Sequence, residues 1–246
     1  MQHRSKKIKK SFFIILVVLI VLSGGSAIYL GNYYHSVDVE KYMNGSSEVS
    51  VEKIDKGWFF DGAGEEKALI FYPGAKVATE AYAPLMYQLA ESGIDCFLVD
   101  MPFHMAFFGM NRAEEIMQEY NYEAWYLGGH SLGGAMAANF AADYVEDHTD
   151  GIRGLLLLAA YPTKDLSTSD MSVVTVYGSE DGVLNMDKIV AGRELMPQDY
   201  KEVCIEGGNH AQFGSYGAQK GDGTAAIPAE EQWARTVEVF VGDESE

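Results

Sequence analysis

The sequence predicts an α/β fold in which a mostly parallel sheet has helices on both faces. Apolar runs typical of buried strands alternate with amphipathic segments between about residues 48 and 241. These runs are apolar throughout instead of at every second position, which is typical of parallel strands covered on both sides. A serine flanked by glycines lies between one such run and the helix-like segment that follows it. With 48% hydrophobic residues, the chain has enough apolar side chains to form a core.

The expected elements follow one another with short connections. A hairpin is expected from residue 49, with its turn at the glycine-rich segment 61–66. Gly93 ends one helix, and Pro228 begins the last helix, where proline is favoured because its missing N–H would have had no partner. The further strands are expected over 67–74, 94–100, 123–128, 152–162, 172–179 and 200–207, and the helices over 81–92, 113–120, 132–147, 186–195 and 228–240.

The N-terminus predicts a membrane segment. Residues 1–10 contain five basic side chains and no acidic one, and no charge follows between Lys10 and Asp38. An apolar stretch of about 20 residues is long enough to cross the hydrocarbon core of a bilayer. Residues 11–31 are therefore expected to form a transmembrane signal anchor. Basic residues before the span keep that end in the cytoplasm and place the rest of the protein outside it.

The corresponding domain plan has a cytoplasmic tail over 1–10, a linker over 32–47, a globular domain over 48–241 and an acidic tail over 242–246. The expected location is the cell membrane, with a single span and an extracytoplasmic globular domain. The alternative is a signal peptide with an apolar core over 12–22, cleaved near Gly25 and Ala27, which would release a secreted protein.

Charge and cysteine content exclude several classes of function. The net charge is −18, and the basic side chains of the first ten residues leave the remainder more acidic still, which argues against a nucleic-acid partner. Cys96 and Cys204 lie in strand-like runs and are expected to be buried, reduced thiols. Neither has a cysteine or histidine at metal-ligand spacing, so no metal site is expected.

Ser131, in the stretch GGHSLGGAMAA, has the surroundings of a nucleophile. A serine on a sharp turn between a strand and a helix needs small neighbours, and Gly129 and Gly133 provide them. The turn also places the hydroxyl near a helix N-terminus, where unpaired N–H groups stabilise an oxyanion. Glycine patterns of dinucleotide- and phosphate-binding loops are absent from the sequence.

A base and an acid are expected after Ser131 in the chain. Of the two later histidines, His148 ends the helix that begins at the serine, roughly 25 Å away at about 1.5 Å per residue. His210, in a loop after a strand, is therefore the expected base. Asp181, in the stretch GSEDG, is the expected acid, and Glu180 and Asp165 are the alternatives.

At these residues the chain resembles the α/β-hydrolase superfamily, specifically small single-domain serine hydrolases related to the dienelactone hydrolases. The resemblance rests on FYPGAKV, GGHSLGGAMAA, VYGSEDG and GGNHAQFG in this order. It implies Ser131 as nucleophile, Asp181 as acid and His210 as base. It also implies an oxyanion hole formed by the backbone N–H groups of Leu132 and Ala75. Dienelactone hydrolases use a cysteine nucleophile, so their substrate is not carried over to this chain.

The expected function is hydrolysis of a small carboxylic ester through an acyl-enzyme, without a metal or organic cofactor. An acyltransferase with the same triad and a catalytically inactive binding module are the alternatives. Phe103 and His104 are candidate pocket residues. Only residues 162–171 separate two predicted strands where related lipases insert a lid, so short acyl chains are expected.

Overall fold

The computed structural model describes Leu16 and residues 31–148 and 151–243. The chain divides into two compact units, Met1–Tyr33 and Tyr34–Glu246, and the second contains the whole sheet. The predicted transmembrane segment over 11–31 lies outside the described residues except for its positions 16 and 31. Within the described ranges, no helix combines the length and apolar character that crossing a bilayer requires.

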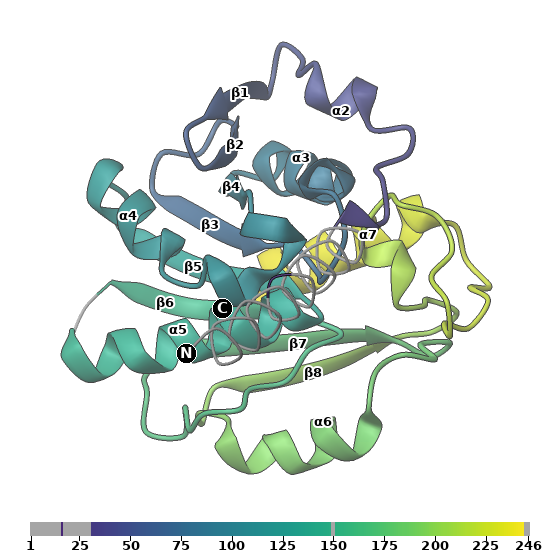
Figure 1. The fold of residues 1–246 in the computed structure, drawn as a ribbon. Coiled ribbons are helices and arrows are strands. Elements are labelled where there is room, and N and C mark those ends of the chain that lie inside the picture. The colour runs from purple at the N-terminus through teal and green to yellow at the C-terminus, as the bar shows by residue number, and fades with distance from the viewer. Residues whose placement is uncertain (1–15, 17–30, 149–150, 244–246) are drawn as a thin grey trace, which may run out of the picture. The chain divides into compact units, whose positions relative to one another are not determined.

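The second unit is built on one eight-stranded sheet (Figure 1). Its spatial order is β1-β2-β4-β3-β5-β6-β7-β8. The pairs β1–β2 and β2–β4 are antiparallel, and every other neighbouring pair is parallel, which confirms the predicted mostly parallel sheet. The strands are β1 (Ser50–Ile54), β2 (Gly57–Asp61), β3 (Lys67–Tyr72), β4 (Asp95–Val99), β5 (Ala124–His130), β6 (Ile152–Leu158), β7 (Ser172–Gly178) and β8 (Tyr200–Ile205).

Helices cover both faces of the sheet, as the sequence predicts. Side chains of α3 (Ala83–Glu91) and α7 (Ala229–Asp243) belong to one buried apolar cluster, and those of α4 (Arg112–Glu119) and α5 (Leu132–Asp147) to another. The central strands alternate between the clusters: Leu69 faces the first, and Ile70 faces the second. Both faces of the central strands are therefore buried, which explains why these strands are largely apolar along their whole length. The short helix α6 (Met186–Gly192) lies beyond β8 in the view of Figure 1.

The hairpin turn is not where the sequence prediction placed it. Ile54 pairs with Gly57, so the chain turns at Asp55–Lys56, and residues 62–66 instead connect β2 to β3. Gly57 has a φ of +149°, and a Cβ there would overlap the carbonyl oxygen of Leu98. The antiparallel contact of β2 with β4 thus requires a glycine at the start of β2.

Residues 34–39, called the strap below, pack onto the domain, although a linker is expected over 32–47. The Tyr34 N–H donates to the Lys76 carbonyl at 2.7 Å, and the Tyr34 carbonyl accepts from Ala78 at 2.8 Å. The Val37 N–H donates to the carbonyl of Ser215 at 2.8 Å. The compact unit accordingly begins at Tyr34 and not at residue 48. A single helical turn, α2 (Glu40–Met43), follows the strap.

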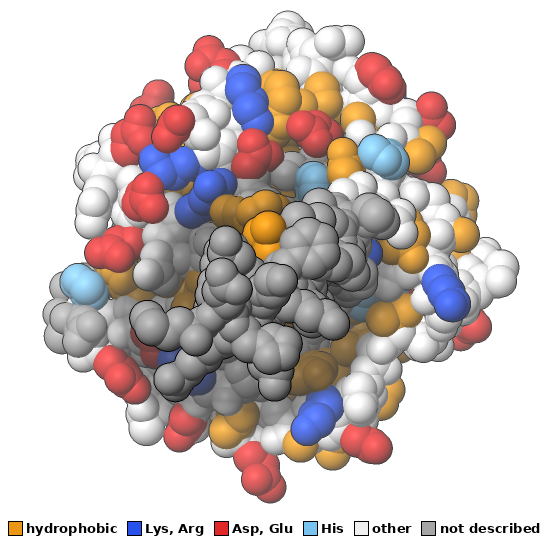
Figure 2. Space-filling view, viewed as in Figure 1, with side chains coloured by type: hydrophobic (Ala, Val, Ile, Leu, Met, Phe, Trp, Pro, Cys, Tyr) orange, Lys and Arg blue, Asp and Glu red, His pale blue; other side chains and the backbone are white. Residues whose placement is uncertain are grey.

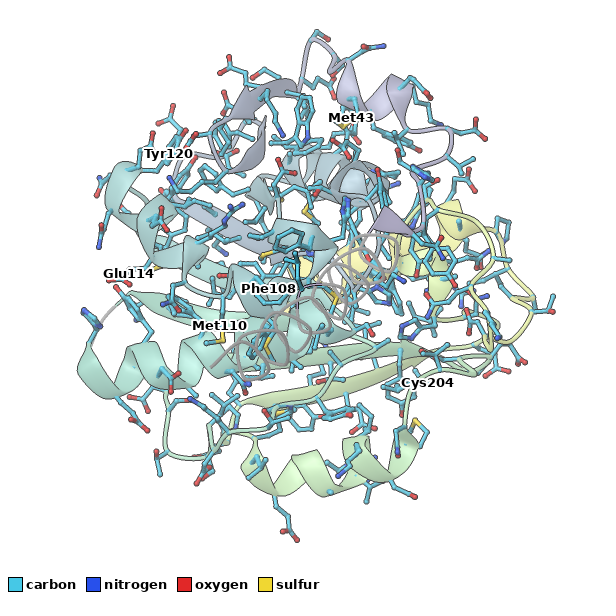
Figure 3. All side chains as sticks on the ribbon, viewed as in Figure 1. Met43, Phe108, Met110, Glu114, Tyr120 and Cys204 are labelled. Carbon is cyan, nitrogen blue, oxygen red and sulfur yellow. The ribbon has the colours of Figure 1, made fainter. Side chains whose placement is uncertain are left out.

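The cysteine prediction is half wrong. Cys96 is buried in β4, but Cys204 is exposed (Figure 3). Its strand β8 is the last strand of the sheet, so it has a paired neighbour on one side only. Both thiols are free, as expected. On the part of the face that is visible in Figure 2, acidic side chains lie at several separate places among other side chains.

Candidate active site

Four strand ends assemble the candidate site. Because β3, β5, β7 and β8 run in the same direction, their carboxyl ends lie at one edge of the sheet. Ala75 follows β3, Ser131 follows β5, Asp181 follows β7, and His210 follows β8. In open α/β sheets this edge is where ligands bind.

Ser131 has a strained backbone that packing holds in place. Its φ is 53° and its ψ is −121°, backbone angles that residues other than glycine rarely adopt. The Ser131 N–H donates to the carbonyl of Leu158 on the neighbouring strand at 2.9 Å. A Cβ at Gly129 would lie 2.6 Å from the backbone of Gly133, and one at Gly133 would overlap the carbonyl of Tyr72. The glycines are therefore required for helix α5 to begin this close to the sheet.

His210 and Asp181 form a buried pair. His210 Nδ1 and Asp181 Oδ2 are 2.8 Å apart, and each side chain is only 2% exposed. The other Asp181 oxygen accepts the N–H groups of Val183 and Leu184, at 2.8 and 2.7 Å. Asp181 Oδ1 thus fixes the backbone that follows Asp181, while Oδ2 is free to contact the imidazole of His210.

The two alternative acids lie in other contacts. A Glu180 carboxylate oxygen accepts from the Ser179 hydroxyl, and Asp165 accepts the N–H of Ser167 within its own exposed loop. Among the three candidates, Asp181 is the acid that meets His210.

Ser131 and His210 line the same cavity, which has a volume of about 350 Å³. Ser131 Oγ makes no hydrogen bond to the described part of the chain. Catalytic hydrogen bonds are often long before substrate binds, so the lack of a hydrogen bond between Ser131 Oγ and His210 is compatible with a nucleophile and its base. The described residues that line the cavity include no Asp, Glu, Lys or Arg. The remaining lining residues are Leu132, Ala135, Met136, Ala159, Ala160, Tyr161, Thr163, Val183, Leu184 and Asn185.

The N–H groups of Leu132 and Ala75 donate to no other described residue. Leu132 is the first residue of α5, where an N–H has no partner inside the helix. On either side of Ala75 the backbone is fixed, since the Gly74 N–H donates to the Tyr82 hydroxyl at 3.0 Å and the Lys76 N–H donates to the His104 carbonyl at 2.7 Å. Both predicted oxyanion-hole donors are therefore unsatisfied groups in ordered backbone.

A buried hydrogen-bonded chain supports this loop and was missed at the sequence level. The Gly74 N–H donates to the Tyr82 phenol oxygen, which in turn shares a hydrogen bond with His130 Nδ1, 2.7 Å away. The His130 ring centroid lies 4.4 Å from that of His210. Burial, and then the proximity of His210, holds the pKa of His130 well below its usual value. His130 is directly beside Ser131 in sequence, but only the fold reveals its partner Tyr82.

The other candidate residues, His148, Phe103 and His104, do not line the cavity that contains Ser131. His148 ends α5 and stacks on Tyr144, with ring centroids 4.2 Å apart. Phe103 is exposed, and neither it nor His104 lines the cavity that contains Ser131. Both residues belong to the segment between β4 and α4, as does Phe108 in Figure 3. Within the described ranges, no group of three His, Cys, Asp or Glu side chains could hold a metal ion.

Comparison with known proteins identifies the family. A sequence model of the alpha/beta hydrolase family matches residues 68–234, so the chain belongs to this family. The search of curated proteins gave no match. Carboxyl esterase 2 from the mycorrhizal fungus Tuber melanosporum has a similar structure, with a TM-score of 0.59, 13% identity and coverage of 85% of this chain and 89% of the esterase.

Two further solved structures share the fold. The monoacylglycerol lipase of Paleococcus ferrophilus aligns with a TM-score of 0.57 and 14% identity, covering 80% of this chain and 99% of the lipase. A thermostable esterase from Pseudomonas putida aligns with a TM-score of 0.55 and 16% identity, covering 83% of this chain and 85% of the esterase.

The depressed pKa of His130 predicts how stability depends on pH. The unfolded chain binds a proton below the usual value of 6.5, whereas the folded chain resists protonation at this buried ring. The free energy of unfolding is therefore expected to fall as the pH drops below 6.5, by roughly 1.4 kcal/mol per pH unit from this group. In His130→Gln, whose amide oxygen can accept from Tyr82, this component is lost. Urea unfolding of both proteins between pH 5 and 8 measures the difference, and parallel curves would contradict the assignment.

Proposed function

We propose that the protein is a serine hydrolase that cleaves a small, neutral carboxylic ester through Ser131, His210 and Asp181. The observation that carries the proposal is the buried His210–Asp181 pair, which shares a cavity with a serine on a strained turn. The names of the similar structures, an esterase and a monoacylglycerol lipase among them, agree with ester substrates. The relation to the dienelactone hydrolases is proposed from the four sequence motifs and concerns architecture only.

In the proposed mechanism, Ser131 Oγ attacks the ester carbonyl carbon as His210 takes the hydroxyl proton. Asp181 stabilises the resulting imidazolium through Nδ1. The carbonyl oxygen becomes an oxyanion and accepts the N–H groups of Leu132 and Ala75. When the bond to the leaving alcohol breaks, His210 donates its proton to that oxygen. His210 then deprotonates a water molecule, which attacks the acyl-enzyme and releases the acid, and the proton returns to Ser131 Oγ.

The cavity walls support a short, uncharged acyl group. They carry no permanent charge that would pair with an ionic substrate. Residues 159–171, between β6 and β7, contain no helix, so no helical lid covers the site at this position. A long acyl chain would then have no lid at this position to bury its methylene groups.

The N-terminus supports a proposal about location. We propose that residues 11–31 are an uncleaved membrane anchor, with residues 1–10 in the cytoplasm and the catalytic domain outside it. The five leading basic charges and the uncharged stretch after them support this orientation.

Ser131→Ala is expected to lower kcat by about 10⁴–10⁶-fold, the range seen when a triad nucleophile is removed. The smaller side chain fits the turn, so the thermal midpoint should stay near that of the wild type. The measurement is hydrolysis of p-nitrophenyl butyrate, with labelling by a fluorophosphonate probe as an independent test of the nucleophile. A folded variant that still hydrolyses the ester at nearly the wild-type rate would refute the assignment.

The kcat/KM values for p-nitrophenyl esters are expected to be highest from acetate to butyrate. Each further methylene of the acyl chain contributes about 0.8 kcal/mol to the binding free energy, but only if the protein buries it. Met136 lines the cavity, so Met136→Ala enlarges the cavity and should move the optimum toward longer acyl chains. Measurements from acetate to palmitate test this expectation. An optimum at decanoate or beyond, or a jump in rate once the substrate exceeds its solubility, would contradict it.

The full-length protein is expected to remain with membranes through high-salt and carbonate washes, with its catalytic domain open to external protease. Mature protein that begins near Ile28 and is soluble in the medium would instead establish a cleaved signal peptide. A soluble, full-length protein in the cytoplasm would contradict both export proposals.

A further inference from the structure

Asp222 connects the loop of the acid to the loop of the histidine, although neither the motifs nor the family resemblance points to it. The residue lies between η5 (Ala211–Phe213) and α7. Its Oδ1 accepts the N–H of Gly182 at 3.1 Å and that of His210 at 3.3 Å. Its Oδ2 accepts the N–H of Ala211 at 2.8 Å. One carboxylate thus holds the residue after Asp181 and the backbone of His210.

The two loops also interlock sterically. A Cβ at Gly182 would lie 2.6 Å from the carbonyl oxygen of Gly221 and 2.9 Å from the nitrogen of Gly223. A Cβ at Gly223 would overlap the carbonyl of Glu180. Glycines on both sides therefore allow the backbone around Asp222 to approach the acid loop closely enough for its carboxylate to reach the N–H of Gly182.

The remaining contacts keep Asp222 in place. Its own loop is fixed by the Asn209 side-chain amide, which donates to the Gly223 carbonyl at 2.8 Å. On the other side, the Lys220 N–H donates to the Tyr34 hydroxyl at 3.2 Å. Because Asp222 is held from both directions, its carboxylate is an ordered acceptor and not a mobile surface charge.

From these contacts we propose that Asp222 is a positioning residue for the Asp181–His210 pair. It touches neither substrate nor the imidazole ring. It holds the backbones that carry the two side chains, so that His210 Nδ1 stays within hydrogen-bond distance of Asp181 Oδ2. This inference rests on the proposed hydrolase function and adds a second carboxylate with a separate task.

Loss of this carboxylate should affect the chemical step more than substrate binding. The acid and the base come from different loops, which follow the paired strands β7 and β8, and small displacements of catalytic groups are costly. Asp222→Ala is expected to lower kcat by about 10–100-fold with KM changed by no more than about twofold. Asp222→Asn keeps one acceptor oxygen, so its kcat should lie between those of the wild type and the alanine variant.

The test compares the full-length wild type, Asp222→Ala, Asp222→Asn and a matched control, Asp165→Ala. Asp165 also accepts a backbone N–H, that of Ser167, but it does not itself line the cavity that contains Ser131. Two measurements are made on each protein. The first is kcat and KM with p-nitrophenyl butyrate, without and with added sodium formate, which can occupy the space of the missing carboxylate in Asp222→Ala. The second is amide hydrogen exchange of residues 179–184 and 208–213.

The expected result is a graded loss of kcat at nearly constant KM, partial recovery of Asp222→Ala by formate, and faster exchange in both segments. Asp165→Ala should match the wild type in each measurement. A kcat of Asp222→Ala within twofold of an active wild type overturns the proposal, and so does unchanged exchange in the two segments. A wild type that hydrolyses no ester refutes the proposed function instead, and the exchange measurement then still decides whether Asp222 holds the loops.

Discussion

The constraint on which the site depends is the backbone conformation of Ser131. A positive φ at a residue with a side chain is unfavourable by about 1–3 kcal/mol and persists only where the surroundings hold it. Here the hydrogen bond to Leu158 and the close approach of Gly129 to Gly133 hold it. The same packing sets where α5 begins, and therefore where the Leu132 N–H points. The serine hydroxyl and one of the proposed oxyanion donors are thus placed by a single turn.

The other site residues are placed by the sheet, but their fine adjustment comes from loops. Parallel strands bring Asp181 and His210 to the same edge as Ser131. The sheet alone does not set a 2.8 Å contact between two loop side chains. Two carboxylates that accept backbone N–H groups support that contact, Asp181 within its own loop and, as proposed above, Asp222 between the two loops. The precision of the site therefore depends on local polar contacts laid over a rigid apolar scaffold.

Features of the fold that depend on residues close together in the chain could be predicted from the sequence. Apolar runs located the strands, and the glycines around Ser131 indicated the turn after β5. Residues whose partners are distant in sequence could not be predicted in this way. Asp222 accepts the N–H of Gly182, which lies 40 residues earlier in the chain, and Tyr82 is hydrogen-bonded to His130, 48 residues later. Cys204 was misplaced because an apolar run looks the same whether its strand is central or at the edge of the sheet.

The strap connects the N-terminal end of the compact unit to two loops of the candidate site. Tyr34 is hydrogen-bonded to both Lys76 and Ala78, which follow Ala75 in the chain, and Val37 is hydrogen-bonded to Ser215 in the segment after His210. A pulling force applied to the chain before Tyr34 would reach these two loops before it reached the sheet. The first hydrogen bonds to break under such a load would be those of Tyr34 to the residues that follow Ala75. Tension on the N-terminus would then loosen the site while the eight-stranded core remained folded.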